Sequence, residues 1–482
     1  MPLDEVLQEI SDFCRANGIA ESTFGRLAVN DGKLAARLRE GRSLTTSTVD
    51  RLRQFMATYG KDRATNRGAV AQNGTHGSNY IAAAAPRPTV VESIVNREPS
   101  GPMSADEAEA QKNFRFFDNR QKYLLFVNTC SEKQVVSDRV ALELANITPR
   151  PPAFRLFDAG VGDGTVLMRV VRAMHARYPA MPFYVMGKEI SLEDVRLTLD
   201  KLADRLYEHP PMVTVLTNLY YSEAPWLAPR SPAAAQGLIW KEVALSGSSS
   251  HDFQEQIEEL QPFLAEKWSA HVSEKTGNPV YDRPVVLVIY REDQRFLLDS
   301  VLPRPGRVVA DYDLVIASQP YRARASTEFK AQKVVAPLAR SLGWGGRLIG
   351  IHSAGGDPGL EIVQKVWPGE NPFHTSRHDL LKEVKRELGS AARDYNFNAY
   401  SDARSLFRYD MHTMPGEVSG PVGTSTLFAA WNAAIYVAQI EDQRLSEVVR
   451  DDQYLKATGE VLRSRGGLWF NDESYVISRH RA

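Results

Sequence analysis

The chain of 482 residues is poor in cysteine, with only Cys14 and Cys130. Two cysteines cannot build a disulfide framework or a structural zinc site, which is typical of a reducing compartment, so we expect a cytoplasmic protein. The chain also lacks net charge, because 58 Lys and Arg stand against 59 Asp and Glu. With a formal charge of -1, it has no overall positive field that would draw it to nucleic acid or to a membrane.

Other signals are absent too. The first residues, Met-Pro-Leu-Asp-Glu-Val, lack a basic region and a long apolar run, so we predict neither a signal peptide nor a membrane span. The sequence has no repeat, metal-ligand cluster, Walker loop or nucleophile elbow. Its length predicts two or more domains.

What the chain does have is an apolar run ending at Asp158, three glycines at alternate positions, and then a helical period. A strand, a tight turn and a helix open a doubly wound α/β domain. Gly160, Gly162 and Gly164 allow a sharp turn and the close approach of a ligand. A dinucleotide fingerprint would need glycine where Thr165 stands. Asp158 can accept from an ammonium group but would repel a pyrophosphate.

The stretch Phe154 to Val171 resembles motif I of the class I S-adenosylmethionine (AdoMet)-dependent methyltransferases. The resemblance implies a Rossmann-like domain in which Asp158 and the three glycines hold the methionine part of AdoMet. Glu189 ends the second predicted strand, near the ~20-residue spacing expected of a ribose-binding acid. Asn218 ends the third predicted strand, where the family contacts adenine, often with an acid.

A second motif, Ser318-Gln319-Pro320-Tyr321, follows the buried-type run Asp313 to Ala317. It resembles the [Asn/Asp/Ser]-x-Pro-[Tyr/Phe] signature of enzymes that methylate amino nitrogens. The Ser318 side chain and the Gln319 carbonyl would accept amine N–H groups, and Tyr321 would offer an aromatic face to a planar or cationic acceptor. The resemblance therefore implies methyl transfer at Ser318, Pro320 and Tyr321, without a metal.

Residues 1–60 predict a small all-α module that resembles a phage-repressor helix-turn-helix, with Gly32 to Arg42 in the recognition position. Four basic side chains of that stretch would face DNA: Lys33, Arg37, Arg39 and Arg42. The alternative is a helical interaction or dimerisation module that would support a homodimer and whose arginines form a solvated face.

Residues 61–103 are rich in Gly, Ala, Asn, Ser and Pro, and we predict a flexible linker. The methyltransferase domain would cover 104–482. Its insertion at about 220–308 is too long for an ordinary connection, and we expect it to cap the substrate side. Within it we predict a strand, Val285 to Tyr290, that forms a hairpin with Phe296 to Leu302.

The remaining C-terminal pattern predicts a helix from Phe329 to Leu342 and another from Trp431 to Leu445. Late strands are expected at Leu406 to Met411 and Tyr475 to Ser478, the second antiparallel at the sheet edge.

Three functions fit these motifs. The first is an AdoMet-dependent N-methyltransferase whose acceptor is a small amine, a protein side chain or a nucleobase. The second is a DNA-binding regulator whose α/β domain senses AdoMet. The third is a nucleic-acid N-methyltransferase addressed by the helix-turn-helix, which the near-zero net charge disfavours.

Overall fold

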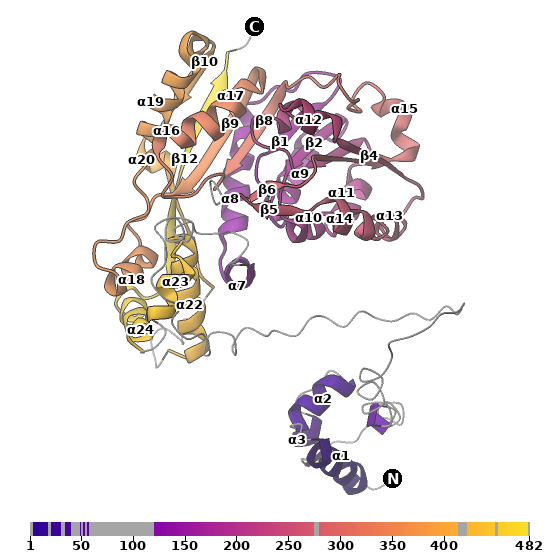
Figure 1. Ribbon diagram of the computed structural model, residues 1–482, viewed down its shortest axis with the longest axis vertical. Coiled ribbons are helices and arrows are strands. Elements are labelled where there is room, and N and C mark those ends of the chain that lie inside the picture. Colours follow the sequence, from indigo (N-terminus) through magenta and orange to yellow (C-terminus); the bar gives the residue numbers. More distant parts are fainter. Residues whose placement is uncertain are drawn as a thin grey trace. The chain divides into compact units, whose positions relative to one another are not determined.

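The computed structural model describes residues 3–17, 21–29, 34–39, 49, 52–53, 55–56, 120–273, 279–412, 422–448 and 452–480. The chain divides into two compact units, residues 1–89 and 90–482, which are described separately (Figure 1). The linker predicted at 61–103 lies outside the described residues.

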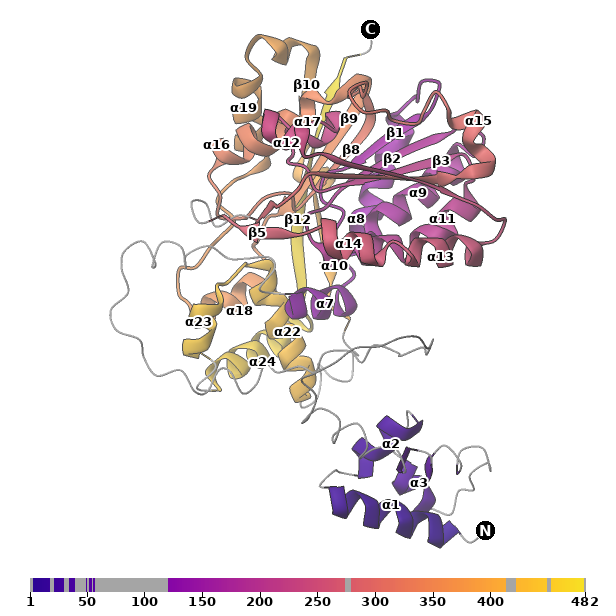
Figure 2. The ribbon, with the colours of Figure 1, turned by 45° about the vertical axis from the view of Figure 1, so that its right-hand side comes forward.

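The described part of the N-terminal unit contains three helices, α1 (Leu3–Asn17), α2 (Glu21–Val29) and α3 (Leu34–Arg39) (Figure 2). Their apolar sides meet in a small core in which Ile10 and Phe24 are fully buried. The helices predicted over this part of the chain are therefore present.

Five parallel strands form the centre of the larger unit: β1 (Phe154–Asp158), β2 (Phe183–Lys188), β3 (Met212–Thr217), β8 (Tyr312–Ser318) and β9 (Leu342–Ser353). The chain moves outward from β1 through β2 to β3, and then returns with β8 and β9 on the other side of β1. The strand order reverses between β1 and β8, and doubly wound sheets bind ligands at the carboxyl ends of the strands at such a point. The predicted doubly wound α/β fold is confirmed.

The sheet continues past β9 with strands from the end of the chain. β12 (Trp469–Arg479) runs antiparallel to β9, and β10 (Tyr395–Asn398) and β11 (Leu406–Asp410) both pair with β12. Both late strands that we predicted are present. The second is not an edge strand as expected, because β10 lies beyond it.

The insertion extends the other side of the sheet. β7 (Val285–Arg291) pairs antiparallel with β3, and β4 (Ile239–Leu245) pairs parallel with β7. The predicted strand is confirmed, but its hairpin partner is wrong: the expected segment contains the helix α15 (Arg295–Leu298). A separate hairpin forms from β5 (Ala270–Val272) and β6 (Pro279–Tyr281).

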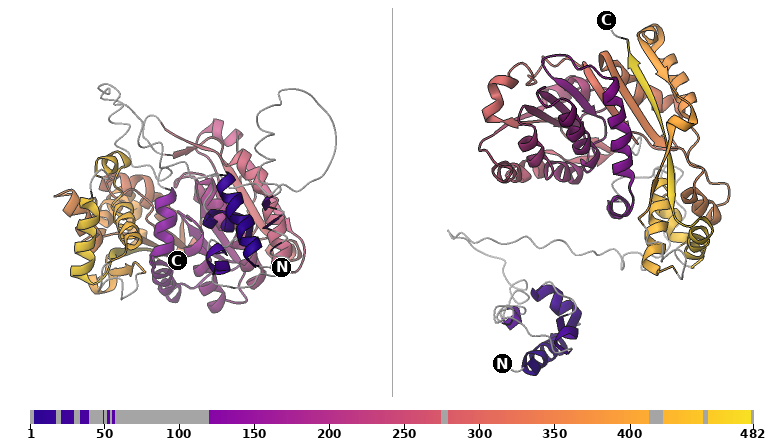
Figure 3. Two further views of the ribbon diagram at one scale, coloured as in Figure 1. Left: turned by 90° about the horizontal axis from the view of Figure 1, so that it is seen from below. Right: turned by 180° about the vertical axis from the view of Figure 1, so that it is seen from behind.

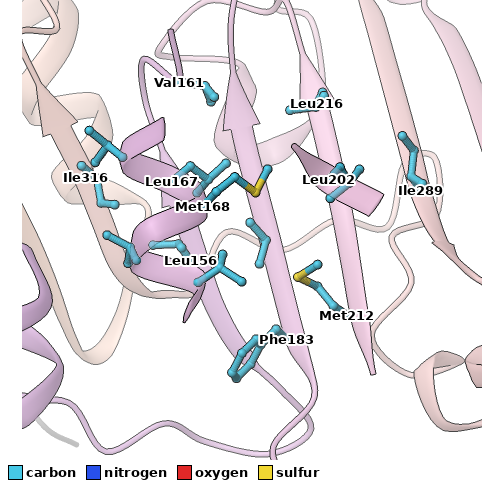
Figure 4. Close-up of a cluster of buried hydrophobic side chains, with 14 of the residues drawn as sticks. Leu156, Val161, Leu167, Met168, Phe183, Leu202, Met212, Leu216, Ile289 and Ile316 are labelled. Atoms are coloured by element: carbon cyan, nitrogen blue, oxygen red, sulfur yellow. The ribbon is translucent and has the colours of Figure 1, made fainter. Parts of the chain in front are cut away.

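Helices cover both faces of the sheet (Figure 1). The elements around the first core cluster are α8 (Glu132–Ala141), α9 (Thr165–Arg177), α10 (Leu192–Leu199), α11 (Leu202–Glu208), α13 (Ser250–Glu258) and α14 (Gln261–Lys267). Leu156, Met212 and Ile316 of three strands meet Leu167 and Met168 of α9 in this core (Figure 4). Strands covered on both faces are continuously apolar, which explains their buried-type sequences.

The second core cluster lies on the opposite face and includes residues of a π-helical turn (Lys330–Val335), α17 (Ala336–Arg340) and α19 (Arg377–Leu388). The helix predicted from Phe329 to Leu342 has three parts: α16 (Thr327–Phe329), a π-helical turn (Lys330–Val335) and α17 (Ala336–Arg340). Pro337 has no N–H to donate into an α-helical ladder, which fits a change of helical type just before it. α19 (Arg377–Leu388) packs beside this segment, and α12 (Pro232–Gln236) is a short helix of the insertion.

A third cluster is mostly helical and joins segments from both ends of the unit. It contains α7 (Arg120–Thr129), α18 (Pro358–Val366), α22 (Thr424–Val437), α23 (Asp442–Val448) and α24 (Gln453–Arg465). The long strand β12 reaches from the sheet into this cluster (Figure 3). The single helix predicted from Trp431 to Leu445 is in fact two, broken at Gln439, whose φ is 51°.

Candidate functional site

The glycine loop after β1 has the geometry that its glycines suggested. Gly162 and Gly164 have φ of 56° and 78°, which side chains other than glycine rarely adopt. A Cβ on Gly164 would lie 2.8 Å from Thr198 Oγ1, so this glycine allows close packing. A Cβ on Gly160 would meet nothing within 4 Å. Gly160 therefore opens onto free space.

Glu189, after β2, ties the loop in place. Its Oε2 accepts from the Gly162 N–H at 2.9 Å, and its Oε1 accepts from the N–H groups of Ile190 and Ser191 at 2.7 and 2.9 Å. Burial and the charge of Asp194 raise the pKa of Glu189. The carboxylate joins the ends of β1 and β2 while its own residue lines the cavity described below.

Asp158, at the end of β1, is almost fully buried. Its Oδ1 accepts from the Gly160 N–H at 3.2 Å. Burial raises the pKa of Asp158 to about 7, the charge of Glu189 adds to the rise, and the Gly160 N–H and Lys133 oppose it. A cation beside Asp158 would favour its ionised form.

The second motif lies beyond β8, on the other side of the point where the strand order reverses. Gln319 has φ of 47°, and its side chain Nε2 donates to Ser353 Oγ at 3.1 Å and to Asp472 at 3.3 Å. A positive φ at a non-glycine residue is uncommon and is found at functional sites. Pro320 O accepts from the Tyr221 hydroxyl at 2.7 Å. These bonds hold the backbone of the motif on both sides.

Tyr321 is buried, and its hydroxyl lies 2.7 Å from His352 Nδ1. The Lys330 ammonium lies 5.2 Å from the centre of the Tyr321 ring and donates to Ala323 O and Thr375 Oγ1. Burial lowers the pKa of Lys330 to about 8. No sequence pattern pointed to this lysine, which lies nine positions after the tyrosine within the π-helical turn.

One cavity of about 1030 Å³ joins the two motifs. Eight of the residues predicted from the sequence line it: Asp158, Gly160, Gly162, Glu189, Ser318, Gln319, Pro320 and Tyr321. The strand order explains this, because the carboxyl ends of β1, β2 and β8 lie side by side.

Two predicted residues do not line the cavity. Gly164 caps α9 and packs against Thr198. Asn218 is fully buried: its Nδ2 donates to Arg283 O and its Oδ1 accepts from the Val285 N–H, both at 2.8 Å. Its amide therefore joins the end of β3 to the start of β7, and we do not include it in the proposed site.

Aromatic residues of distant segments close the cavity near the glycine loop. The Tyr123 hydroxyl of α7 accepts from the Asp163 N–H at 3.2 Å and donates to its Oδ1 at 3.3 Å. The ring of Tyr436, from α22, lies 6.0 Å from that of Tyr123. Nothing local in the sequence identified Tyr436.

The glycine-loop half of the cavity is rich in carboxylates. Asp158, Glu189 and Asp194 line it. Glu132 and Lys133 also line the cavity and form an ion pair with each other, with 3.0 Å between Lys133 Nζ and Glu132 Oε2. The Lys188 ammonium sits 4.8 Å from the centre of the Tyr221 ring, and burial lowers the pKa of Lys188. This half of the cavity suits a positively charged ligand.

The DNA-binding prediction for the N-terminal unit remains a prediction. The Arg39 guanidinium binds both carboxylate oxygens of Glu21, at 2.8 and 2.7 Å. Lys33, Arg42 and the side chain of Arg37 lie outside the described residues. An exposed pair of this kind is weak, so Arg39 can exchange it for another anion.

The described ranges contain no helix long and apolar enough to cross a membrane. They also contain no group of three or more His, Cys, Asp or Glu side chains placed to hold a metal ion.

The chain matches no protein-family model and no curated protein. Among solved structures it matches a protein from Galdieria sulphuraria assigned as a sarcosine dimethylglycine methyltransferase. The identity is 10%, 71% of this chain and 85% of that chain are covered, and the TM-score is 0.30.

A second match is phospholethanolamine N-methyltransferase 2 from Haemonchus contortus, at 10% identity and a TM-score of 0.25, covering 72% of this chain and 53% of that chain. A third is PKMT2 from Rickettsia typhi with AdoHcy, at 11% identity and a TM-score of 0.23, with the same coverages. The chain spans about half the length of these two proteins. At such identities and TM-scores the matches carry no argument about activity, which must come from the cavity itself.

Proposed function

We propose that this protein is an AdoMet-dependent methyltransferase that acts on an amino nitrogen. The observation that carries the proposal is the single cavity, with an acidic half at the glycine loop and the Ser318–Tyr321 motif in the other half. Its volume of about 1030 Å³ is at the upper end of the ~300–1,000 Å³ typical of ligand sites, which leaves room for a donor and an acceptor together.

AdoMet fits the acidic half on two grounds. A Cβ at Gly160 would enter free space, so the glycine leaves room for a ligand against the backbone. AdoMet carries a sulfonium and an ammonium group, and Asp158 and Glu189 supply opposite charge. In this arrangement Asp158 accepts from the methionine ammonium, and Glu189 accepts from the ribose hydroxyls while it holds Gly162.

AdoMet supplies an already activated methyl group, so the protein contributes position and exclusion of water. Ser318 Oγ and the Gln319 carbonyl accept the N–H groups of the acceptor and direct its lone pair. Tyr321 forms a wall beside the nitrogen. The hydrogen bonds from Gln319 Nε2 and to Pro320 O keep the motif in place during transfer.

The competing proposal is a regulator that only senses AdoMet. A sensor has no need of space beside the donor, whereas here the motif residues line the same cavity as the glycine loop. We therefore favour the enzyme. The acceptor class stays open among small amines, protein lysines and nucleobase amino groups.

The test is transfer of labelled methyl from AdoMet to four probes: glycine, ethanolamine, poly-L-lysine and a single-stranded oligonucleotide with adenine and cytosine. We expect label in one class, and a loss of roughly 100-fold in Tyr321→Ala, as for a misplaced reacting group. Tyr207→Ala, which changes an exposed tyrosine of α11, is the matched control.

A parent protein that binds AdoMet but labels neither these probes nor any fraction of cell extract would contradict the enzyme and favour the sensor. Equal transfer by the parent and Tyr321→Ala would remove the motif from the mechanism.

A further inference from the structure

A hydrogen-bonded series of four buried polar side chains runs inward from the acceptor half of the cavity. The Tyr321 hydroxyl lies 2.7 Å from His352 Nδ1, and His352 Nε2 lies 2.7 Å from Glu473 Oε1. Glu473 Oε2 accepts from Arg377 Nη1 at 2.7 Å. All four side chains are buried. This hydrogen-bonded series begins with Tyr321 at the cavity wall and ends with Arg377 on α19.

The sheet itself brings the members together. His352 on β9 and Glu473 on β12 are direct partners in the antiparallel register. Arg377 begins α19, and its backbone N–H also donates to Glu473 Oε1 at 2.7 Å. Its guanidinium donates further to Ala399 O and pairs with Asp402. Glu473 is thus held by hydrogen bonds to both His352 and Arg377.

The direction of each hydrogen bond follows from the charge on Glu473. Burial alone would raise the pKa of Glu473, but hydrogen bonds from His352 and Arg377 lower it to about 2. The carboxylate can therefore only accept, so His352 Nε2 carries a hydrogen. When the imidazole is neutral, its other nitrogen is the acceptor, and the Tyr321 hydroxyl at 2.7 Å donates to His352 Nδ1.

The Tyr321 hydroxyl is thus engaged on the side away from the acceptor. Besides His352, it has the Tyr475 hydroxyl at 3.4 Å. A buried tyrosine anchored by its hydroxyl loses rotational freedom, and its ring is held in one place. The acceptor then meets the ring of Tyr321 rather than its hydroxyl.

We propose that His352 and Glu473 are positioning residues that fix the ring of Tyr321 at the wall of the acceptor half. Their importance for transfer rests on the function proposed above. The anchoring itself does not depend on that function and can be measured separately.

The first measurement needs no acceptor. Imidazole ¹⁵N spectra of the full-length protein are recorded at neutral pH, and His352→Asn identifies the resonances of His352. We expect the neutral tautomer with hydrogen on Nε2, and a shift of the Nδ1 resonance in Tyr321→Phe as its donor is lost. Hydrogen on Nδ1, or an Nδ1 resonance unmoved in Tyr321→Phe, would contradict the proposed hydrogen bond from Tyr321 to His352.

The second measurement is a double-mutant cycle on methyl transfer to whichever of the four probes is labelled. Tyr321→Phe and His352→Asn should each lower kcat by roughly tenfold, since misplacement by about 1 Å can cost ~100-fold. The double variant should be no slower than the slower single variant, because both changes break one link. AdoMet affinity should change less than about twofold throughout.

Tyr475→Phe, which removes only the 3.4 Å contact, is the control and should transfer at the parent rate. Additive losses in the cycle would overturn the proposal, as would losses of kcat that vanish once the folded fraction is measured. If His352→Asn does not fold, His352→Gln replaces it both in the assignment of the resonances and in the cycle. A parent without transfer would contradict the proposed function, while the ¹⁵N spectra would still decide the anchoring.

Discussion

Asp158 is a buried carboxyl group that, in the proposed complex, contacts the positively charged ammonium of AdoMet. Burial raises its pKa to about 7, so near neutral pH a large share of the carboxyl groups is protonated. A bound cation favours the ionised form and lowers this pKa, so binding releases a proton. We therefore expect AdoMet affinity to rise with pH between about 6 and 8, by at most roughly tenfold per unit.

Calorimetry in two buffers of different ionisation enthalpy measures the released proton directly. Asp158→Asn should bind more weakly and lose most of the pH dependence, while the raised pKa of Glu189 leaves a small remainder. Affinity that falls as the pH rises would show that Asp158 does not face a cation.

The limits of sequence reasoning also show at single residues. Asp158, Gly160 and Glu189 could be placed in the site because each lies at the end of a strand or within two residues of it. Asn218 occupies an equivalent position, yet its amide is used by β7, which joins the sheet after a long insertion. His352 and Glu473 are 121 positions apart, so only the strand pairing brings them together.

Among the elements, α7 contacts the glycine loop directly through Tyr123. It packs against α22, and the Asn432 side chain of α22 donates to Lys122 O at 3.0 Å. Tyr123, the residue after Lys122, connects α7 to the loop through its two hydrogen bonds with Asp163. α22 thereby supports a turn that lies more than 250 residues earlier in the chain.

Tyr123→Phe keeps the ring and removes both bonds to Asp163. Two long hydrogen bonds contribute about 0.5–1.5 kcal/mol, so AdoMet affinity should fall roughly 2- to 12-fold. Isothermal titration measures the change, and Tyr178→Phe is the matched control, since its hydroxyl bonds to Leu144 O and Ile147 O away from the cavity. An unchanged affinity in Tyr123→Phe would separate α7 from donor binding.

Local patterns were enough to predict most elements of the sheet. The run from β1 through the glycine loop into α9 is contiguous, so its strand, turn and helix could be identified directly. The position of β12 inside the sheet depends on β10, four residues long, and such a short strand gives no clear periodicity. The break at Gln439 between α22 and α23 was missed for a similar reason, since no glycine or proline marks it.

In the larger unit, residues far apart in the chain meet around one cavity. β1, β2 and β8 supply its floor, α7 and α22 its side near the glycine loop, and the β5–β6 hairpin part of its wall through Pro279 and Val280. The insertion thus contributes to the cavity, but much of it extends the sheet instead. Its expected role as a cap over the substrate side stays a prediction. The proposed division into module, linker and catalytic domain remains a prediction.

The central claim is that this cavity binds AdoMet, and calorimetric titration of AdoMet into the full chain tests it most directly. Gly160→Val places a side chain in the free space beside the loop, so the fold should persist and binding should be lost. Gly237→Val is the matched control, because its Cβ would have contacts at 3.6 Å and the residue does not line the cavity. We predict one site in the parent and in Gly237→Val, and none in Gly160→Val. No binding by the parent, or equal binding by Gly160→Val, would contradict the account.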